Sequence, residues 1–397
     1  MEIAIIGGGT AGITLAYLLK DCYNICIFER GKDPYHREPD YGFGGSGTFS
    51  DGKLTLSKEV GGQLGGILPN DKYVEYETKA LNFWLGNRDI RDFEFGKYTA
   101  DQNKLRRELL AHNYRLIEAG FIHLGTETMQ ARAKELYEEL VSHPRVTIML
   151  EQPVEDIEAI AKNFDLTVIA TGRTGYIALE NFLRKKRLKY LDNIVDVGIR
   201  YEVKNEVVEH LTKTLYEFKI TRNNVRTFCV NPSGFVVEEN GLANGHSFLS
   251  TKSDFTNFAV LYKYITKNAS KFADKLKSHF NGVKVMPYGK FCGKKDILPN
   301  GRTYLNAKEE DFVSLIPETV VTQLTDFING LEPIIPGIAN DTNNVYAPEI
   351  KTNSIVPQML ELFKLVDNTY IIGDITGYTR GIMQATISAF YLADKLI

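Results

Sequence analysis

Residues 3–12 read Ile-Ala-Ile-Ile-Gly-Gly-Gly-Thr-Ala-Gly, an apolar run followed at once by glycines. The run Ile3–Ile6 is typical of a buried parallel strand. Residues 10–19 predict a helix, and Ile25–Phe28 predicts a second buried strand. A strand, a helix and a strand within about 30 residues form the unit on which doubly wound α/β sheets are built.

Gly7, Gly9 and Gly12 form the pattern G-x-G-x-x-G between the predicted strand and helix. The first glycine permits a tight turn, and the second lets the backbone approach a pyrophosphate. The third lets the helix pack close to the strand, and the helix N-terminus, at Thr10 and Ala11, presents N–H groups to phosphates. A glycine turn without a ligand is the alternative, and the strand–helix context disfavours it.

Glu29 ends the second predicted strand, with Arg30 directly after it. A carboxylate in this position accepts hydrogen bonds from ribose hydroxyls. Because NAD and FAD domains both use this unit, these residues predict a dinucleotide without choosing between the two.

Two later strands end in small or acidic residues, Val168–Gly172 in Ala-Thr-Gly and Ile371–Asp374 in Gly-Asp. Both resemble motifs of the FAD superfamily that includes glutathione reductase and the aromatic hydroxylases. The resemblance implies that Asp374 binds the ribityl or pyrophosphate part of FAD, although an N-cap of the next helix is an open alternative. It also implies that the helix beginning at Gly381 points its positive end at the flavin pyrimidine. Residues implied to contact FAD here are Ala170, Thr171, Gly172, Gly373, Gly381 and Ile382.

The segment Gly42–Leu54 is dense in glycine, which lets backbone amides approach a flat ligand. Together with Gly377–Ala385 it resembles the FAD-dependent dehydrogenases known as NAD(FAD)-utilising dehydrogenases, a family whose substrate is not established. Members of that family carry a segment before the first strand, and we expect its function to be absent here. Further similar stretches are His123–Thr126, Asp196–Arg200, Arg226–Cys229, Asn244–Ser247 and Glu349–Thr352.

The family resemblance implies a flavin-binding role for the glycine-rich segment. Gly45, Ser46, Gly47 and Thr48 would line the flavin. Lys53 would stabilise a reduced, anionic flavin, or it is a surface lysine in a polar turn. Val154 would supply backbone contacts to adenine.

A flavin supplies the hydride chemistry itself, so the protein has to position the substrate and manage protons. Candidate catalytic residues come from the second domain and from the loop before the final helix. Tyr378 and Arg380 are expected beside the flavin ring, where Arg380 would bind a carboxylate or phosphate or form a helix-start ion pair. His246 and Glu349 are possible proton donors, although a structural role for His246 is favoured.

Composition sets the broad class. The chain has 397 residues, 43% hydrophobic and 24% charged, with a net charge of −3. These values give no electrostatic reason to expect nucleic acid as a partner. The glycines at 7–9 and the acidic Glu2 argue against a signal peptide, and no apolar run suits a membrane span. Four cysteines without a metal or C-x-x-C pattern predict no metal site and fit a reducing cytoplasm.

We expect an α/β chain with a Rossmann-type FAD-binding domain and an inserted β-rich α+β substrate domain. The expected FAD-binding domain is discontinuous, at residues 1–60, 120–185 and 367–397. Residues 61–119 are expected to form a helical insertion and residues 186–366 the substrate domain. Helices are expected at 74–83, 104–119, 127–142 and 257–280, and β-rich runs at 194–203, 215–220 and 225–237.

The leading functional prediction is an FAD-dependent oxidoreductase acting on a small molecule. One glycine fingerprint leaves no dedicated nicotinamide domain, so NAD(P)H would bind only transiently as an electron donor. An FAD-dependent hydroxylase, a non-catalytic flavin-bound partner protein and a tRNA-modifying flavoprotein are the alternatives. Oligomeric state is left open by the sequence.

Overall fold

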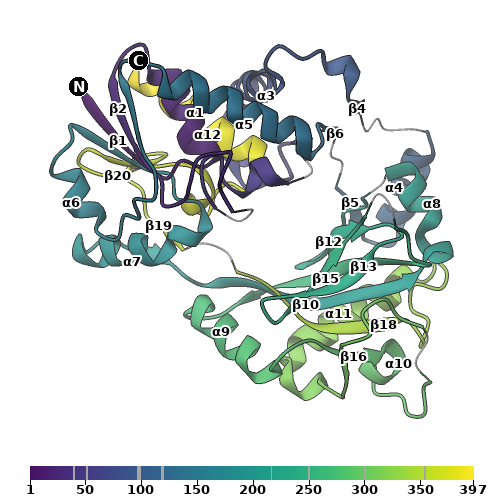
Figure 1. Ribbon diagram of the computed structural model, residues 1–397. Coiled ribbons are helices and arrows are strands. Elements are labelled where there is room, and N and C mark those ends of the chain that lie inside the picture. The colour runs from purple at the N-terminus through teal and green to yellow at the C-terminus, as the bar shows by residue number, and fades with distance from the viewer. Residues whose placement is uncertain are drawn as a thin grey trace. The chain divides into compact units, whose positions relative to one another are not determined.

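The computed structural model describes residues 1–38, 41–50, 52–95, 100–117, 120–215, 217–248, 251–298, 301–352 and 355–397. The chain forms two compact units. Unit 1 comprises Met1–Gly96, Ala119–Leu191 and Ser354–Ile397, and unit 2 comprises Lys97–Glu118 and Asp192–Asn353. Both units combine helices and sheets (Figure 1).

The elements of unit 1 come from all three of its segments. Its helices are α1 (Thr10–Leu19), α2 (Leu64–Ile67), α3 (Asn70–Leu85), α5 (Thr126–Val141), α6 (Ile157–Ala161), α7 (Tyr176–Lys185) and α12 (Gly381–Leu396), with 3-10 turns η1 (Ser46–Phe49), η2 (Ile90–Asp92), η3 (Arg173–Gly175) and η5 (Gly373–Thr376). Its strands are β1 (Glu2–Ile6), β2 (Asn24–Phe28), β3 (Lys53–Leu56), β4 (Glu94–Phe95), β6 (Gly120–His123), β7 (Val146–Met149), β8 (Leu166–Ile169), β9 (Tyr190–Leu191), β19 (Val356–Pro357), β20 (Lys364–Val366) and β21 (Thr369–Ile371).

The elements of unit 2 are mostly strands. They are β5 (Arg115–Leu116), β10 (Ile194–Lys204), β11 (Ile220–Arg222), β12 (Val225–Asn231), β13 (Phe235–Glu239), β14 (Leu242–His246), β15 (Phe255–Ile265), β16 (Lys284–Pro287), β17 (Lys308–Glu309) and β18 (Asn344–Thr352). Its helices are α4 (Ala100–Ala111), α8 (Asn205–Leu215), α9 (Ala269–Phe280), α10 (Tyr288–Phe291) and α11 (Glu318–Leu331), with the 3-10 turn η4 (Val313–Leu315).

Unit 1 is built around a six-stranded sheet of order β20-β21-β8-β1-β2-β7. All neighbours pair in parallel except β20 and β21. Helices α1, α5 and α12 cover one face, and α6 and α7 cover the other (Figure 1). Because β1 has apolar partners on both faces, its residues 3–6 are all buried, as the continuous apolar run requires.

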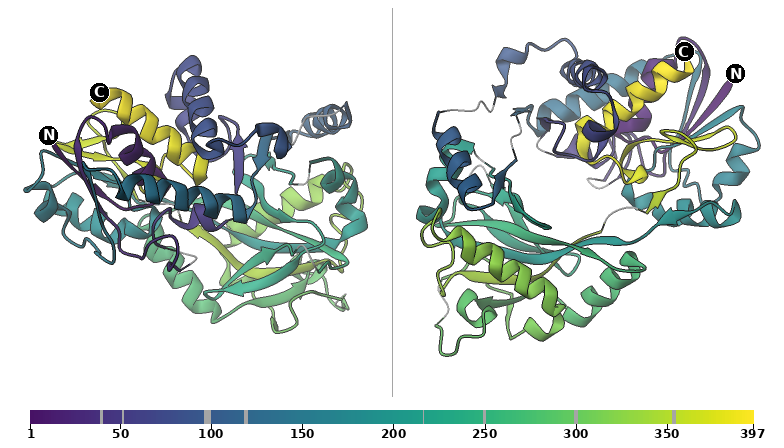
Figure 2. Two further views of the ribbon diagram at one scale, coloured as in Figure 1. Left: turned by 45° about the horizontal axis from the view of Figure 1, so that its top comes forward. Right: turned by 180° about the vertical axis from the view of Figure 1, so that it is seen from behind.

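Unit 2 is built around an eight-stranded sheet of order β17-β16-β18-β10-β15-β12-β11-β5. One face packs against α9, α10 and α11 through a large apolar cluster (Figure 2). The other face is partly covered by the hairpin β13–β14, which forms a small apolar cluster with Val285 and Tyr346. This second face carries the charged residues of β10, because its side chains alternate between the two faces.

Most predicted elements of the parallel sheet are confirmed. Strands β1, β2, β8 and β21, and helices α1, α3, α5 and α12, lie within a few residues of the expected ranges. Two predicted helices are wrong in part. Residues 257–265 belong to β15, a central strand in which residues 256–261 are all buried, and its apolar run Phe258–Tyr262 does not differ from that of a helix. Helix α4 ends at Ala111 and Asn113 has a φ of 62°, so residues 115 and 116 form β5.

The units divide the chain at positions other than the expected domain boundaries. Residues 61–95 lie in unit 1 and not in a separate insertion, because α3 packs on α12. Residues 355–366 also lie in unit 1, since β20 joins the edge of its sheet. Residues 118 and 119, the end of the expected insertion, lie outside the described residues.

A buried hydrogen bond joins α3 to α12, and removing it by substitution tests the packing of these two helices. Trp84 Nε1 donates to Thr386 Oγ1 over 2.8 Å. Thr386→Val leaves that donor without a partner and should lower the free energy of unfolding by about 1–3 kcal/mol. Denaturation followed by the fluorescence of Trp84, the single tryptophan, measures this. Thr78→Val, at an exposed hydroxyl of α3, is the control and should change stability by less than about 0.5 kcal/mol. Equal effects would contradict the assigned packing.

Candidate functional site

The carboxyl ends of four strands of unit 1 meet at one edge of its sheet. Ile6 pairs with Phe28 on one side and with Ile169 on the other, and Ile169 pairs with Ile371. The residues that follow these four positions are Gly7, Glu29, Ala170 and Ile372, and Gly373–Asp374 comes next. Ligands of open α/β sheets bind at such an edge.

Two glycines of the first turn are required by the protein itself. Gly7 has a φ of 109°, and a Cβ atom there would lie 2.5 Å from the carbonyl oxygen of Ala170. At Gly12 a Cβ atom would lie 2.0 Å from the oxygen of Gly7. Gly9 differs, since its backbone is extended and an added Cβ atom would meet nothing nearer than 3.9 Å. The space in front of Gly9 is therefore open toward the outside of the turn.

Glu29 is buried and fixed by backbone donors. Its Oε2 accepts from Gly8 N and its Oε1 accepts from Gly31 N, each over 2.8 Å. A carboxylate has about four acceptor positions, so two remain for a ligand. Replacing Glu29 by alanine would also strand two backbone donors, so that variant cannot isolate ligand binding.

The end of β8 carries a hydroxyl group without a hydrogen bond and a glycine with open space in front of it. Thr171 Oγ1 is buried and, among the described residues, has no hydrogen-bond partner. Gly172 has a φ of 61°, and a Cβ atom there would meet no atom within 4 Å. Gly381 at the start of α12 has a φ of 80° and is equally open. An orphaned hydroxyl beside two uncovered glycines fits a ligand that approaches the backbone closely.

Asp374 links the last strand to the N-terminus of α12. Its Oδ2 accepts from Gly381 N over 3.1 Å and its Oδ1 accepts from Thr379 Oγ1 over 3.0 Å. Burial raises the pKa of Asp374, and the hydrogen bond from Gly381 and the charge of Arg173 oppose that shift. The carboxylate therefore holds the helix start in place at the sheet edge.

The glycine-rich segment lies directly on the first turn. Gly44 N donates to Gly8 O over 2.7 Å, and Gly44 forms a bridge with Gly9. An added Cβ atom at Gly47 would lie 2.9 Å from Ile382, so this segment also approaches α12. Asp51, inside the expected motif, lies outside the described residues.

Arg37, which the sequence analysis did not single out, binds the backbone of this segment through hydrogen bonds. It is 7% exposed, and its Nη1 donates to the carbonyl oxygens of Phe43 over 2.6 Å and Gly45 over 2.8 Å. The guanidinium carbon also lies 4.4 Å from the ring centre of Phe49. A lone arginine before a glycine-rich run gives no recognisable signal, because its partners are backbone carbonyls.

A second glycine pair holds the loop before α12, and it was also missed. Gln63 N donates to Tyr378 O over 2.7 Å, and Arg380 N donates to Gly61 O over 2.5 Å. At Gly62 a Cβ atom would lie 2.3 Å from Tyr378 O. Residues 61–63 thus set the backbone of the predicted catalytic loop.

The other residues predicted to bind FAD, and Lys53, lie in the same unit. The predicted proton donors His246 and Glu349 lie in unit 2, where His246 Nε2 is 2.7 Å from Glu239 Oε1. Thr10 Oγ1 donates to Gly44 O over 3.3 Å, and Ala11 is buried in α1. The loop before Val154 is tied to the sheet edge, because Gln152 N donates to Glu29 O. Arg30 stacks on Tyr41, and Lys53 lies on β3 with its Nζ 4.5 Å from the ring centre of Phe121. Ser46 and Thr48 are in η1, and Ile382 is in the first turn of α12.

No protein-family model matches the chain. Over 87 residues it is 32% identical to an uncharacterised protein of Methanocaldococcus jannaschii, a match that covers 20% of this chain and only 24% of that protein. Similar solved structures include the flavin-dependent halogenase CmlS (TM-score 0.39, 13% identity, 99% of this chain and 56% of that one). Glycine oxidase from Geobacillus kaustophilus (TM-score 0.37, 12% identity, 99% and 93%) and amadoriase I from Aspergillus fumigatus (TM-score 0.39, 13% identity, 100% and 86%) are also similar. These similarities are too distant to assign a cofactor or a reaction.

Within the described part of the chain, no helix is both long and apolar enough to cross a membrane. The described residues also contain no group of three or more His, Cys, Asp or Glu side chains suited to hold a metal ion.

Arg37→Met tests whether this side chain orders the glycine-rich segment. Loss of the guanidinium leaves several buried carbonyl oxygens unpaired and should lower stability by about 2–4 kcal/mol. Chymotrypsin should then cleave at Phe43 or Phe49 in protein that is otherwise folded. Arg91→Met, at an exposed arginine of unit 1, should change neither measurement. A resistant, fully stable Arg37→Met protein would refute the role.

The raised pKa of Asp374 predicts a pH dependence of stability. The unfolded carboxyl ionises near its ordinary value of 3.8, whereas the folded one ionises at higher pH. Stability is therefore lost as pH rises through that interval, and the loss is complete above the folded pKa. Asp374→Asn should gain stability relative to the unsubstituted protein as the pH rises from about 4 through the folded pKa, as thermal unfolding at several pH values would measure. A constant difference across that range would contradict the shift.

Proposed function

We propose that unit 1 binds FAD and that the protein is an FAD-dependent oxidoreductase. One observation carries the proposal: strand β21, from the C-terminal segment, lies beside β8 and brings Gly373, Asp374 and the start of α12 to the edge occupied by the glycine turn. A domain for NAD alone needs no such returning strand, whereas an extended FAD has a second half to hold.

The residues around this edge fit successive parts of FAD. Gly7, Gly9 and the first turn of α1 would hold the pyrophosphate, and Glu29 would accept from the adenosine ribose. The backbone near Val154 would contact adenine, and Asp374 would bind the ribityl chain or the pyrophosphate. Gly45–Thr48 and the N-terminus of α12 would lie against the isoalloxazine ring.

FAD, when bound, supplies hydride transfer through its isoalloxazine ring. The loop Tyr378–Arg380, fixed by residues 61–63, would orient the substrate, with Arg380 binding an anionic group. Lys53 would stabilise negative charge near the ring. We further propose that unit 2 provides the substrate domain and that NAD(P)H, if used, binds transiently. A hydroxylase reaction fits the same cofactor site.

Gly9→Ala provides the sharpest test, because the chain itself has room for the added methyl group. The variant should fold with an unchanged Tm in its flavin-free form and lose at least about tenfold in FAD affinity, since the methyl group crowds the pyrophosphate. Gly66→Ala, at another uncrowded glycine of unit 1, is the matched control. Fluorescence titration of flavin-free protein with FAD measures both. Unchanged affinity in Gly9→Ala would exclude the nucleotide assignment.

An absorption spectrum of the purified protein, with FAD identified after denaturation, tests the cofactor directly. Anaerobic titration with NADH and NADPH then identifies the electron donor. Oxygen uptake stoichiometric with a hydroxylated product would favour the hydroxylase, whereas flavin bleaching by substrate alone would favour a dehydrogenase or oxidase.

A further inference from the structure

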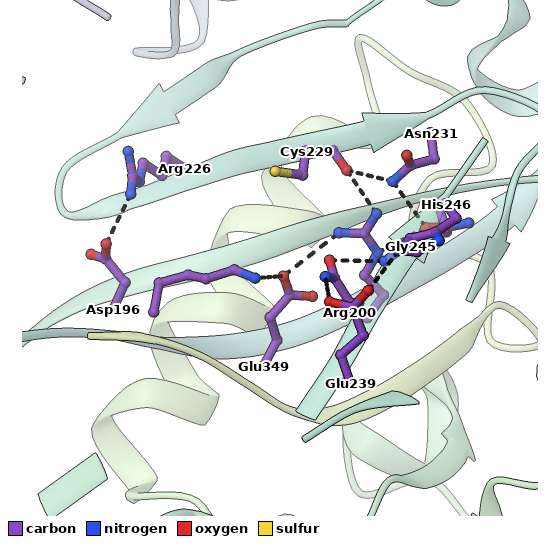
Figure 3. Close-up of polar contacts among 12 residues, drawn as sticks. Asp196, Arg200, Arg226, Cys229, Asn231, Glu239, Gly245, His246 and Glu349 are labelled. Carbon is purple, nitrogen blue, oxygen red and sulfur yellow. Dashed lines mark hydrogen bonds and ion pairs between the residues drawn. The ribbon is translucent and has the colours of Figure 1, made fainter. Parts of the chain in front are cut away.

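Unit 2 contains a buried charged cluster that its own fold leaves incomplete. Arg200 on β10 and Glu349 on β18 are fully buried, and Arg200 Nη1 lies 3.6 Å from Glu349 Oε1, beyond hydrogen-bond length (Figure 3). Both Glu349 oxygens, Arg200 Nη1 and Asn257 Nδ2 lack a hydrogen-bond partner among the described residues. Each such buried group costs about 1–3 kcal/mol, more when charged, so four together call for an explanation.

The other polar atoms of Arg200 and Asn257 form normal hydrogen bonds. The unpaired atoms are therefore not explained by poorly placed side chains. Arg200 Nε donates to Asn257 Oδ1 over 2.8 Å, and its Nη2 donates to Cys229 O over 2.7 Å. Cys229 sits at a β-bulge with a φ of 46°, which turns its carbonyl oxygen toward the guanidinium. The atoms without a hydrogen-bond partner therefore belong to side chains whose other polar atoms are fixed by hydrogen bonds.

A neighbouring carboxylate shows that this fold can satisfy such a group. Glu202 is also buried and lies two residues further along β10. Its Oε2 accepts from Asn344 and from Tyr346, each over 2.9 Å, and its Oε1 accepts from Thr303. Glu349 lies in the same sheet, but Arg200 and Lys351 approach only its Oε1, and neither of its oxygens accepts a hydrogen bond among the described residues.

Two cations approach Glu349. Lys351 Nζ lies 3.3 Å from Glu349 Oε1, so Arg200 and Lys351 both face this oxygen. The nearby Arg226–Asp196 pair is neutral in itself, with a contact of 2.8 Å. Lys351 also interacts electrostatically with Glu239. The cluster therefore offers two donors, Arg200 Nη1 and Asn257 Nδ2, and the two Glu349 oxygens as acceptors, all without a hydrogen bond among the described residues.

We infer that this cluster is a binding site for a small carboxylate that carries a hydroxyl or amino group next to its carboxyl group. The ligand carboxylate would accept from Arg200 Nη1 and Asn257 Nδ2. The adjacent O–H or N–H group would donate to Glu349.

The hairpin β13–β14 covers the cluster and has to shift when the ligand enters. Gly245 lies so close that a Cβ atom there would be 1.9 Å from Arg200 Nη2. Lys351 is 23% exposed and marks the side that reaches solvent. Gly245 of β14 therefore packs directly on the Arg200 guanidinium group.

Thermal unfolding of the full chain with added probes tests the inference. The probes are both enantiomers of lactate, alanine, phenylalanine and glutamate, with propionate and ethylamine as compounds that offer only one of the two groups. At least one 2-hydroxy or 2-amino acid should raise Tm by about 2 °C or more at millimolar concentration, and propionate and ethylamine should not. If no acid does so, or if propionate does equally well, the inference is overturned.

Variants locate the site. Lys351→Met removes a partly exposed cation and should weaken binding of the active probe by about tenfold while the protein stays folded. Glu349→Gln should weaken it further, and Lys294→Met, at an exposed ion pair of unit 2, should leave it unchanged. Unaltered binding in Lys351→Met and Glu349→Gln would place the probe elsewhere and refute the assignment. Gly9→Ala protein should still bind the probe, so failure of the FAD proposal and failure of this one give different results.

Discussion

The turn between β1 and α1 depends on two backbone contacts that leave no room for a side chain. Gly7 rests on the carbonyl group of Ala170, and Gly12 rests on that of Gly7. The absence of a side chain at Gly7 lets the end of β8 pack against β1. The absence of one at Gly12 lets α1 pack close to the strand. Because the whole parallel sheet continues outward from these three elements, the position of every residue at its carboxyl edge follows from this approach.

Buried guanidinium groups serve opposite purposes in the two units. In unit 1 Arg37 Nη1 donates to carbonyl oxygens of the glycine-rich segment, so the buried guanidinium is hydrogen-bonded and fixes that segment in one conformation. In unit 2 Arg200 keeps one nitrogen without a hydrogen bond, beside a carboxylate in the same condition. Burying polar groups is costly unless they are paired. The first arrangement therefore stabilises a loop. The second leaves buried donors and acceptors that a bound ligand would pair.

The sequence predicted which residues meet at the carboxyl edge of the sheet of unit 1. Glycines at 7, 9 and 12, a carboxylate at 29 and the Gly-Asp pair after β21 all follow short apolar runs, so their position in the fold could be inferred. Arg37 and Gly61–Gly62 were missed because they contact backbone atoms, and no residue type is characteristic of such contacts. The strand at 257–265 was taken for a helix because its residues 256–261 are all buried, which removes the alternation that identifies strands. The incomplete hydrogen bonding around Glu349 depends on four segments at once and could be found only in three dimensions.

The pairing of β21 with β8 has a consequence for how the protein is made. Strand β8 is complete when residue 169 has been synthesised, but its neighbour on that side arrives only with residues 369–371. During translation of the intervening 199 residues, the edge of an apolar parallel sheet stays open to other strands. A nascent chain in this condition exposes an unpaired strand edge, which favours wrong pairing and aggregation until residues 369–371 have been made.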